Sequence, residues 1–246
     1  MDKIALKDAL VARGFFKDER EATARVLSKE VKVEGEFCTS PNKTVGLNDL
    51  IEVLEEKKYV SRGGLKLEHA ILEFGVPIEG KKCLDIGASS GGFSDCLLQF
   101  GAKSVTCVDV NYGQLDWKIR KDPKTIIFER TNIKKVSCEE IEGPFDVVVI
   151  DVSFIGLASL AKKIASFCNV DGKVSHLIAL VKPQFEANKA EVKDGFVEDK
   201  EVKDRTVEEV KSALREVGFK IEGDIKSPIV GKKMKNEEFL IYACTH

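Results

Sequence analysis

Short apolar runs alternate with amphipathic segments from about residue 64 to residue 244. The runs have the length of strands, and the segments between them place apolar residues at helical spacing. This alternation predicts an α/β fold with a mainly parallel sheet that helices cover on both faces. The last two runs have a short connection, so one of them should be antiparallel. The predicted strands are 81–87, 104–110, 125–128, 145–151, 175–181, 219–227 and 237–244, and the predicted helices are 64–75, 91–99, 157–167 and 201–217.

The first 58 residues follow a different pattern. Two helical segments, 4–11 and a second from about Asp18, are followed by alternation of period two over 31–37 and a short strand at 50–55. We therefore expect a small α+β domain over residues 1–58 and a larger domain over 59–246. Apolar side chains expected to face the core of the small domain are Leu6, Leu10, Ala22, Val26 and Leu27.

The segment 183–199 is polar and shows no periodicity. Connections of this length without regular structure are uncommon and are often functional. We expect an aperiodic loop here, directly after Lys182.

Composition narrows the class of protein. The chain has 246 residues, of which 43% are hydrophobic and 33% charged, a composition that excludes a disordered protein. Its 39 basic and 41 acidic side chains nearly cancel, so binding to nucleic acid would depend on local patches. No apolar run is long enough to span a membrane, and the start shows no signal peptide. These features predict a cytoplasmic protein.

The seven cysteines give no sign of a metal or disulfide site. Their number is odd and no C-x-x-C pair occurs. This usage argues against a disulfide framework and against zinc, and it favours buried free thiols in a reducing compartment.

A glycine-rich turn gives the strongest local signal. The run CLDIGASSGGF (83–93) leads from an apolar strand through Asp85 and several glycines into a helix, as ligand-binding turns do at the carboxyl edge of a doubly wound sheet. The next strand ends at Asp109, where an acid commonly binds a ribose diol. A tight turn without a ligand is the alternative.

The same turn also satisfies the G-x-S-x-G pattern of serine hydrolases. Ser89, Asp151 and His176 occur in the chain order of a hydrolase triad. Against this interpretation, only one small module precedes the strand, and His176 lies within an apolar run, where a core histidine is more common.

Two lysines and two carboxylates are predicted to gather around this turn. Asp151 and Lys182 each follow an apolar strand, and Glu238 begins the last one. Lys66 follows a glycine pair at a predicted helix start. Each alone is more often a solvated charge, but the combination around one glycine-rich edge indicates chemistry.

Several motifs together resemble the TlyA family, also labelled haemolysin A. They are YVSRGGLKLEHA (59–70), DIGASSGGF (85–93), DVNYGQL (109–115), RTN (130–132), DVSFI (151–155) and LVKPQFE (180–186). That family is similar to FtsJ-type RNA ribose methyltransferases with an added amino-terminal RNA-binding domain of the S-four type. The resemblance implies a Rossmann-like methyltransferase fold, S-adenosylmethionine as cofactor and RNA, in particular ribosomal RNA, as substrate.

The resemblance also implies roles for residues. A catalytic set of two lysines and two acids carries over to Lys66, Asp151, Lys182 and Glu238, with Glu237 as an adjacent alternative for the last position. Ribose binding is implied for Asp109 and adenine binding for Asn132. The other residues implied for cofactor binding are Asp85, Gly87, Ser89, Gly91, Gly92, Phe93 and Asp151.

The amino-terminal module departs from the family pattern. Its opening reads Ala5-Leu6-Lys7, and a turn expected to contain glycine reads Ser28-Lys29-Glu30. RNA contacts are expected from Arg13, Arg20, Arg25 and Lys29, with Arg62 beyond the module and Lys232, Lys233 and Lys235 near the substrate entrance. The alternative is a solvated helical face.

Three functions are compatible with these observations. The first is 2′-O-methylation of ribose in RNA. The second is a non-catalytic RNA-binding or ribosome-assembly protein that keeps the methyltransferase shell, against which the lysine–acid set argues. The third is a membrane-lytic haemolysin, for which the sequence offers no long basic amphipathic helix.

Overall fold

A computed structural model describes residues 3–54, 58–169, 172–229 and 236–245. The chain divides into two compact units, Met1–Lys57 and Lys58–His246. The division lies one residue from the boundary expected from the sequence. We describe each unit by itself.

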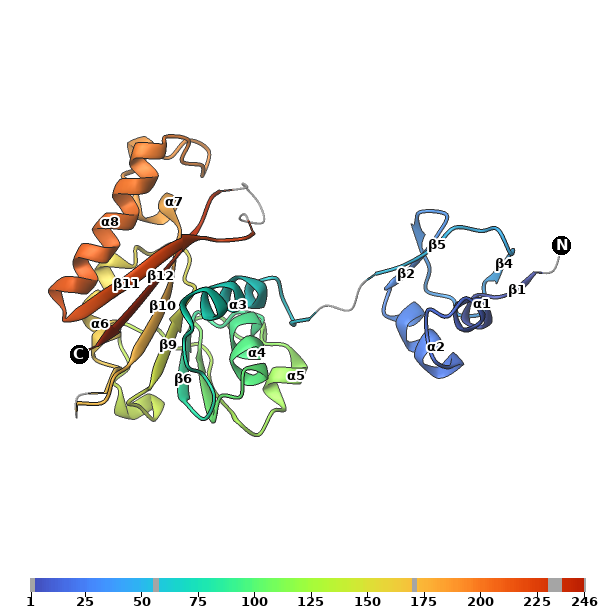
Figure 1. Cartoon of the computed structure of the whole chain (residues 1–246), viewed down its shortest axis with the longest axis horizontal. Coiled ribbons are helices and arrows are strands. Elements are labelled where there is room, and N and C mark those ends of the chain that lie inside the picture. Colours follow the sequence, from blue (N-terminus) through green and yellow to red (C-terminus); the bar gives the residue numbers. More distant parts are fainter. Residues whose placement is uncertain (1–2, 55–57, 170–171, 230–235, 246) are drawn as a thin grey trace. The chain divides into compact units, whose positions relative to one another are not determined.

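The described residues of the amino-terminal unit, 3–54, form two helices and two small sheets, and Figure 1 shows how these elements are arranged. A hairpin turns at Glu34-Gly35, and both residues have positive φ values (54° and 80°), as the favoured two-residue turn requires. The sequence pattern missed β1 and β4, which have two residues each. The elements are β1 (Ile4–Ala5), α1 (Leu6–Ala12), α2 (Glu19–Leu27), β2 (Val31–Val33), β3 (Glu36–Phe37), β4 (Thr44–Val45) and β5 (Ile51–Val53).

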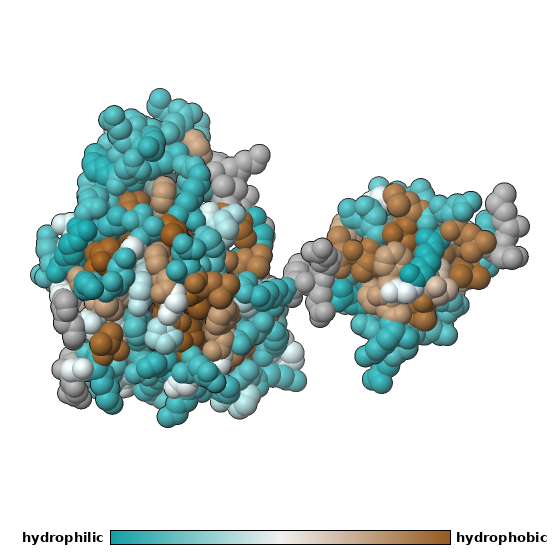
Figure 2. Space-filling view, viewed as in Figure 1, coloured by the Kyte–Doolittle hydropathy of each residue, from teal (hydrophilic) through white to brown (hydrophobic). Residues whose placement is uncertain are grey.

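The core of this unit is formed as expected, with one correction. Leu6, Leu10, Ala22 and Val26 are fully buried. Leu27, which was expected to face inward, is 60% exposed. Ala22 and Val26 are four residues apart and share a helix face, whereas Leu27 lies about 100° around the helix from Val26. Apolar residues also gather on the face of this unit that Figure 2 shows.

The second unit is built on a sheet of seven strands in the order β11-β12-β10-β9-β6-β7-β8. β12 is antiparallel to both of its neighbours, and β6 to β10 are parallel. The strands are β6 (Lys82–Ile86), β7 (Ser104–Val108), β8 (Thr125–Phe128), β9 (Val147–Ile150), β10 (His176–Val181), β11 (Phe219–Lys226) and β12 (Phe239–Thr245).

Helices cover both faces of the sheet, as the alternation predicted (Figure 1). One core cluster includes Leu67 of α3, Leu97 of α4 and Ile119 of α5, and the cluster on the other face includes residues of α6 and α8. The helices are α3 (Gly63–Phe74), α4 (Gly92–Gln99), α5 (Trp117–Arg120), α6 (Ala161–Ala165), α7 (Pro183–Glu186) and α8 (Lys200–Glu216), with single 3₁₀ turns at Glu139–Ile141, Ala158–Leu160 and Lys189–Glu191.

The segment 183–199 is more regular than the sequence indicated. It contains α7, the 3₁₀ turn Lys189–Glu191 and an isolated bridge between Lys193 and Phe196. A reciprocal cap between Asn188 and Glu191 holds the 3₁₀ turn. Elements of one turn are too short to produce a periodic pattern, which is why the expectation of an aperiodic loop was wrong.

The strand order determines where the sheet can bind a ligand. From β6 the chain proceeds to β7 and β8 on one side, and it then returns to form β9 and β10 on the other side. The carboxyl ends of β6 and β9 therefore flank the switch point at which open α/β sheets bind ligands. Gly87 directly follows β6, and Asp151 directly follows β9.

Candidate active site

A cavity of about 410 Å³ opens at the switch point. Five of the residues expected to bind the cofactor line it: Gly87, Ser89, Asp109, Asn132 and Asp151. Its wall also contains apolar side chains that the sequence did not single out: Ile86, Val108, Val110, Ile133, Val152, Phe154, Ile155 and Leu160.

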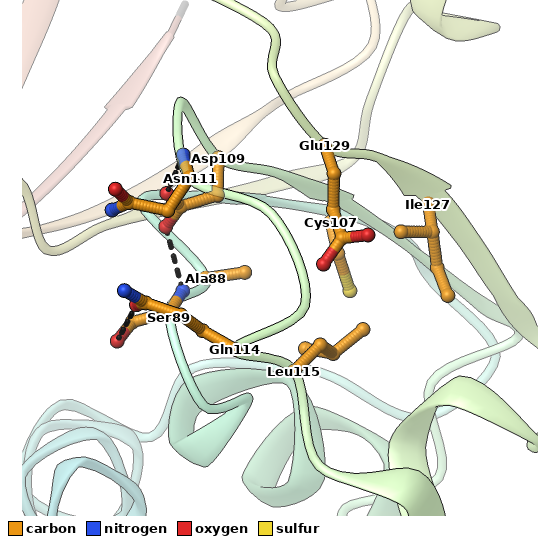
Figure 3. Close-up of a pocket in the computed structure, with 9 residues that line it drawn as sticks. All are labelled: Ala88, Ser89, Cys107, Asp109, Asn111, Gln114, Leu115, Ile127 and Glu129. Carbon is orange, nitrogen blue, oxygen red and sulfur yellow. Dashed lines mark hydrogen bonds between the residues drawn. The ribbon is translucent and has the colours of Figure 1, made fainter.

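The loop around Asp109 is ordered by its own carboxylate (Figure 3). One oxygen of Asp109 accepts the backbone N–H of Ser89 and the other accepts that of Asn111, each at 2.8 Å. These two bonds join the turn after β6 to the turn after β7. Each carboxylate oxygen keeps a lone pair for a further donor, such as the hydroxyl of a ribose diol. A smaller pocket beside them is lined by Gln114, Leu115 and Glu129 among others.

Gly87 allows the closest backbone approach in the site. Its φ is +84°, and a Cβ added there would lie 2.4 Å from the carbonyl oxygen of Asp151. Only glycine tolerates both conditions. The absence of a side chain therefore lets the turn after β6 lie directly against the end of β9.

Four residues expected at the cofactor do not line the cavity. Asp85 is fully buried beneath it, where one oxygen accepts the hydroxyl of Ser94 at 2.5 Å and the other has no partner among the described residues. A Cβ at Gly91 or Gly92 would meet Leu115 or Ser61, so these glycines serve packing between protein segments. Phe93 is a buried core side chain of α4.

The four residues of the expected catalytic set form two ion pairs. Lys66 of α3 binds Glu238, and Lys182 binds Asp151. Both pairs are largely buried, with lysine side chains 11% and 12% exposed. Val181 pairs with Phe239 in the sheet, so Lys182 and Glu238 occupy neighbouring positions at the same edge.

The geometry distinguishes Glu238 from Glu237. Glu238 is buried and contacts Lys66. Glu237 binds Lys203 at 2.9 Å and also Lys226, and these partners hold its pKa down at about 2. Successive side chains alternate about the backbone, so only one of the two glutamates faces α3.

The sheet separates the proposed hydrolase triad. His176 begins β10 at the level of Val147, the first residue of β9, whereas Ser89 and Asp151 lie beyond the carboxyl ends of β6 and β9. His176 is bonded to the hydroxyl of Tyr242 at 2.9 Å and stacks on its ring. His176 therefore lies at the opposite end of the parallel strands from Ser89 and Asp151, which excludes a catalytic triad of these three residues.

Two unexpected side chains of the site lie close to Asp151 in the chain. Ser153 accepts a hydrogen bond from Lys182 at 3.1 Å. Phe154 is 90% exposed and has a φ of +66°, and its ring packs at a tilt against that of Phe185, with 5.2 Å between the ring centroids. Both follow Asp151 within the DVSFI motif, which was the available signal, but hydrophobicity alone would place Phe154 in a core.

The residues expected to contact RNA differ in whether their side chains bind partners within the protein or are exposed. Arg13 donates to the carbonyls of Gly46, Leu47 and Asp49, and Arg25 pairs with Glu30. Both guanidinium groups thus brace the small unit. The side chains of Arg20, Lys29 and Arg62 are exposed, and Lys29 has a φ of +58° at the turn where glycine was expected. Lys232, Lys233 and Lys235 lie outside the described residues.

Metal and membrane features are lacking in the described part of the chain. All seven cysteines are free, and no group of side chains there could hold a metal ion. No described helix is long and apolar enough to cross a membrane.

The site fits S-adenosylmethionine. The carboxylate of Asp109 suits the ribose hydroxyls, and the amide of Asn132 and the apolar wall suit adenine. Fold and site together define a Rossmann-like, S-adenosylmethionine-dependent methyltransferase. Residues 59–244 match the family of FtsJ-like methyltransferases, and the chain belongs to that family and to its TlyA group.

Three known proteins illustrate the similarity. The 16S/23S rRNA (cytidine-2'-O)-methyltransferase TlyA of Mycobacterium tuberculosis is 36% identical over 94% of this chain and 86% of its own. Hemolysin A of Brachyspira hyodysenteriae is 38% identical over 96% and 98%. A solved structure from Streptococcus thermophilus that carries a hemolysin name has a TM-score of 0.74 and 35% identity, and covers 100% of this chain and 89% of its own.

We expect Asp109→Ala to weaken S-adenosylmethionine binding by about tenfold or more, because hydrogen bonds to a charged group contribute roughly 1.5–3 kcal/mol. Calorimetry on the purified protein measures this. Asp116→Ala, which removes an exposed acid of the same loop, serves as the control. Unchanged affinity of the Asp109 variant would refute the ribose contact.

Burial raises the pKa of Asp85 to about 7, and the bond from Ser94 offsets this only in part. The ordinary value is about 3.9, so between these pH values the folded chain holds a proton that the unfolded chain has lost. The free energy of unfolding therefore falls as pH rises from about 4 towards 7, because the folded state must give up a proton that it holds more tightly than the unfolded state does. In urea denaturation between pH 5 and 8, Asp85→Asn should flatten the decline, and Asp116→Asn should not. Equal pH slopes for Asp85→Asn and the unaltered protein would contradict the assignment.

Proposed function

We propose that this protein transfers a methyl group to the 2′ hydroxyl of a ribose in RNA, and that the RNA is ribosomal. The observation that carries the proposal is the position of Asp151, which lines the cofactor cavity and also binds the largely buried Lys182. A single residue thus joins the cofactor site to the lysine–acid set.

The chain's residues suit the demands of this reaction. S-adenosylmethionine, when bound, supplies an already activated methyl group. The protein must then align the ribose oxygen and ease the loss of its proton. We assign to the ammonium group of Lys182, fixed by Asp151 and Ser153, the stabilisation of the negative charge that develops on the 2′ oxygen as its proton leaves to solvent. The Lys66–Glu238 pair adds a second cation and carboxylate beside it, which orient the ribose and Lys182.

The rim of the cavity suits a nucleotide taken out of its stack. Phe154 presents a nearly fully exposed ring there and is backed by Phe185. Proteins that recognise RNA commonly stack unpaired bases on such rings. The strained backbone at Phe154 supports a functional reason for its exposure.

Ribosomal RNA as the substrate is supported by the names of the relatives. The Mycobacterium tuberculosis protein is named for methylation of cytidine in 16S and 23S rRNA, and its similarity extends over both units of this chain. We infer a cytidine ribose as the target here. Membership of the methyltransferase family and the two complete ion pairs weigh against a non-catalytic assembly protein.

We further propose that the amino-terminal unit, residues 1–58 in the sequence division, binds RNA as an S-four-like domain. Arg20 and Lys29 are exposed and form no ion pair within the described residues, so they are available to phosphates. Arg13 and Arg25 have internal partners, and we assign them mainly to holding the unit's loops.

We expect Lys182→Met to reduce methyl transfer to ribosomal subunits by at least about a hundredfold, because the 2′ oxygen loses the ammonium group that stabilises its developing negative charge. Mass spectrometry of 2′-O-methylcytidine in rRNA measures the product. Lys211→Met is the matched control. The side chain of Lys211, on α8, is also largely buried at 16% exposure, and it pairs with Asp224 of β11 at 2.6 Å. S-adenosylmethionine affinity should change little in both. Undiminished transfer by the Lys182 variant would refute its role, and no mark from the unaltered protein would refute the function.

Charge-reversal variants test whether the amino-terminal unit binds RNA. We expect Arg20→Glu combined with Lys29→Glu to weaken rRNA binding about tenfold or more at low salt, with less loss at high salt, because phosphate contacts are salt-dependent. Lys43→Glu, at another exposed position of the unit, is the control. Equal affinities of the double variant and the control would contradict an RNA-binding surface at these residues.

A further inference from the structure

Two large aromatic side chains are exposed in the segment after β7. Tyr112 is 67% exposed and Trp117, the single tryptophan of the chain, is 64% exposed. Each has a cation over its ring: the guanidinium of Arg130 lies 4.4 Å from the ring centroid of Tyr112, and the ammonium of Lys121 lies 4.6 Å from that of Trp117. Rings of this size are normally buried, so two in one short segment indicate a contact surface.

The residues of the first pair are chain neighbours of residues that line the cofactor cavity. Asn111 and Thr131, which flank Tyr112 and Arg130 in the chain, both line that cavity. The backbone N–H of Arg130 donates to the carbonyl of Asn111 at 3.1 Å, which joins the two loops. Arg130 has a φ of +54°, a conformation that costs energy for a residue with a side chain and is often found at functional sites.

The charge of this region differs from that of the whole chain. Residues 109–135 contain seven basic and four acidic side chains. All four acids accept backbone N–H groups and thereby hold the loops: Asp109, Asp116, Asp122 and Glu129. Within the described ranges, neither Arg130 nor Lys121 forms an ion pair. The acids are thus used internally, while these two cations stay available beside the exposed rings.

We propose that Tyr112, Arg130, Trp117 and Lys121 form an RNA-binding face of the catalytic unit, which holds unpaired nucleotides next to the target ribose. The proposal rests on the proposed function. Aromatic rings and guanidinium planes stack on unpaired bases, and lysine and arginine bind phosphates. In double-stranded RNA the bases are paired and stacked, so they would not be available to either ring. A protein partner would leave the cations without the repeated negative charge that RNA supplies.

The single tryptophan provides a direct test. Deproteinised rRNA is added to the full-length protein, and the emission of Trp117 and its quenching by acrylamide are recorded. We expect RNA to change the emission and to shield the ring, and S-adenosylmethionine alone to do neither. A response to intact ribosomal subunits but not to deproteinised rRNA would overturn the proposal in favour of a protein partner.

Two pairs of substitutions then distinguish RNA binding at this surface from binding of S-adenosylmethionine. Tyr112→Ala with Trp117→Ala should weaken binding to deproteinised rRNA more than about tenfold, since each stacked base depends on its ring. Tyr112→Phe with Trp117→Phe should stay within about twofold of the unaltered protein. The affinity for S-adenosylmethionine, measured by calorimetry, should be unchanged in both pairs and shows that they fold.

Two results would overturn the proposal. One is rRNA binding by the alanine pair equal to that of the unaltered protein. The other is an equal loss of S-adenosylmethionine affinity, which would assign the rings to the cofactor site. If the unaltered protein still methylates ribosomal subunits in either case, the proposed function stands and only this surface is refuted.

Discussion

The close approach of two parallel strands at the switch point is the constraint on which the site depends. Gly87 lies against the carbonyl of Asp151, and the ladder between β6 and β9 continues into this contact through a bond from the N–H of Asp151 to the carbonyl of Ile86. A side chain at residue 87 would separate the turn after β6 from the end of β9. The cofactor cavity and the Lys182–Asp151 pair would then no longer share Asp151.

Several acidic side chains bind groups within the protein or are buried, so they do not add negative charge to the exposed surface. Asp109 accepts backbone N–H groups, Asp85 is buried, and Asp151 and Glu238 bind lysines. The near balance of 39 basic and 41 acidic residues therefore describes the chain as a whole and not its exposed faces. Local cationic surfaces can exist on a chain with a net charge of −2.

Two lysine–carboxylate pairs that lie side by side and are largely removed from solvent need a reason beyond stability. Removing charges from water costs about as much as the pairing returns, so such pairs add little net stability, while the loss of one partner is costly. The fold gains little from them at this position. A reaction that must hold a ribose oxygen and move its proton explains them better than packing does.

The sequence by itself determined the elements and the chemistry at their ends. Run length and periodicity are local, so they located the parallel strands, and the residues that follow those strands, Gly87, Asp109 and Asp151, indeed line one cavity. Tertiary structure decided which side chains meet. Lys66 and Glu238 are 172 residues apart, and only strand order and register bring Glu238, rather than Glu237, to α3. Contacts between distant residues depend on packing that a local pattern does not encode, which is also why Asp85 lies beneath the cavity and Leu27 lies outside the core.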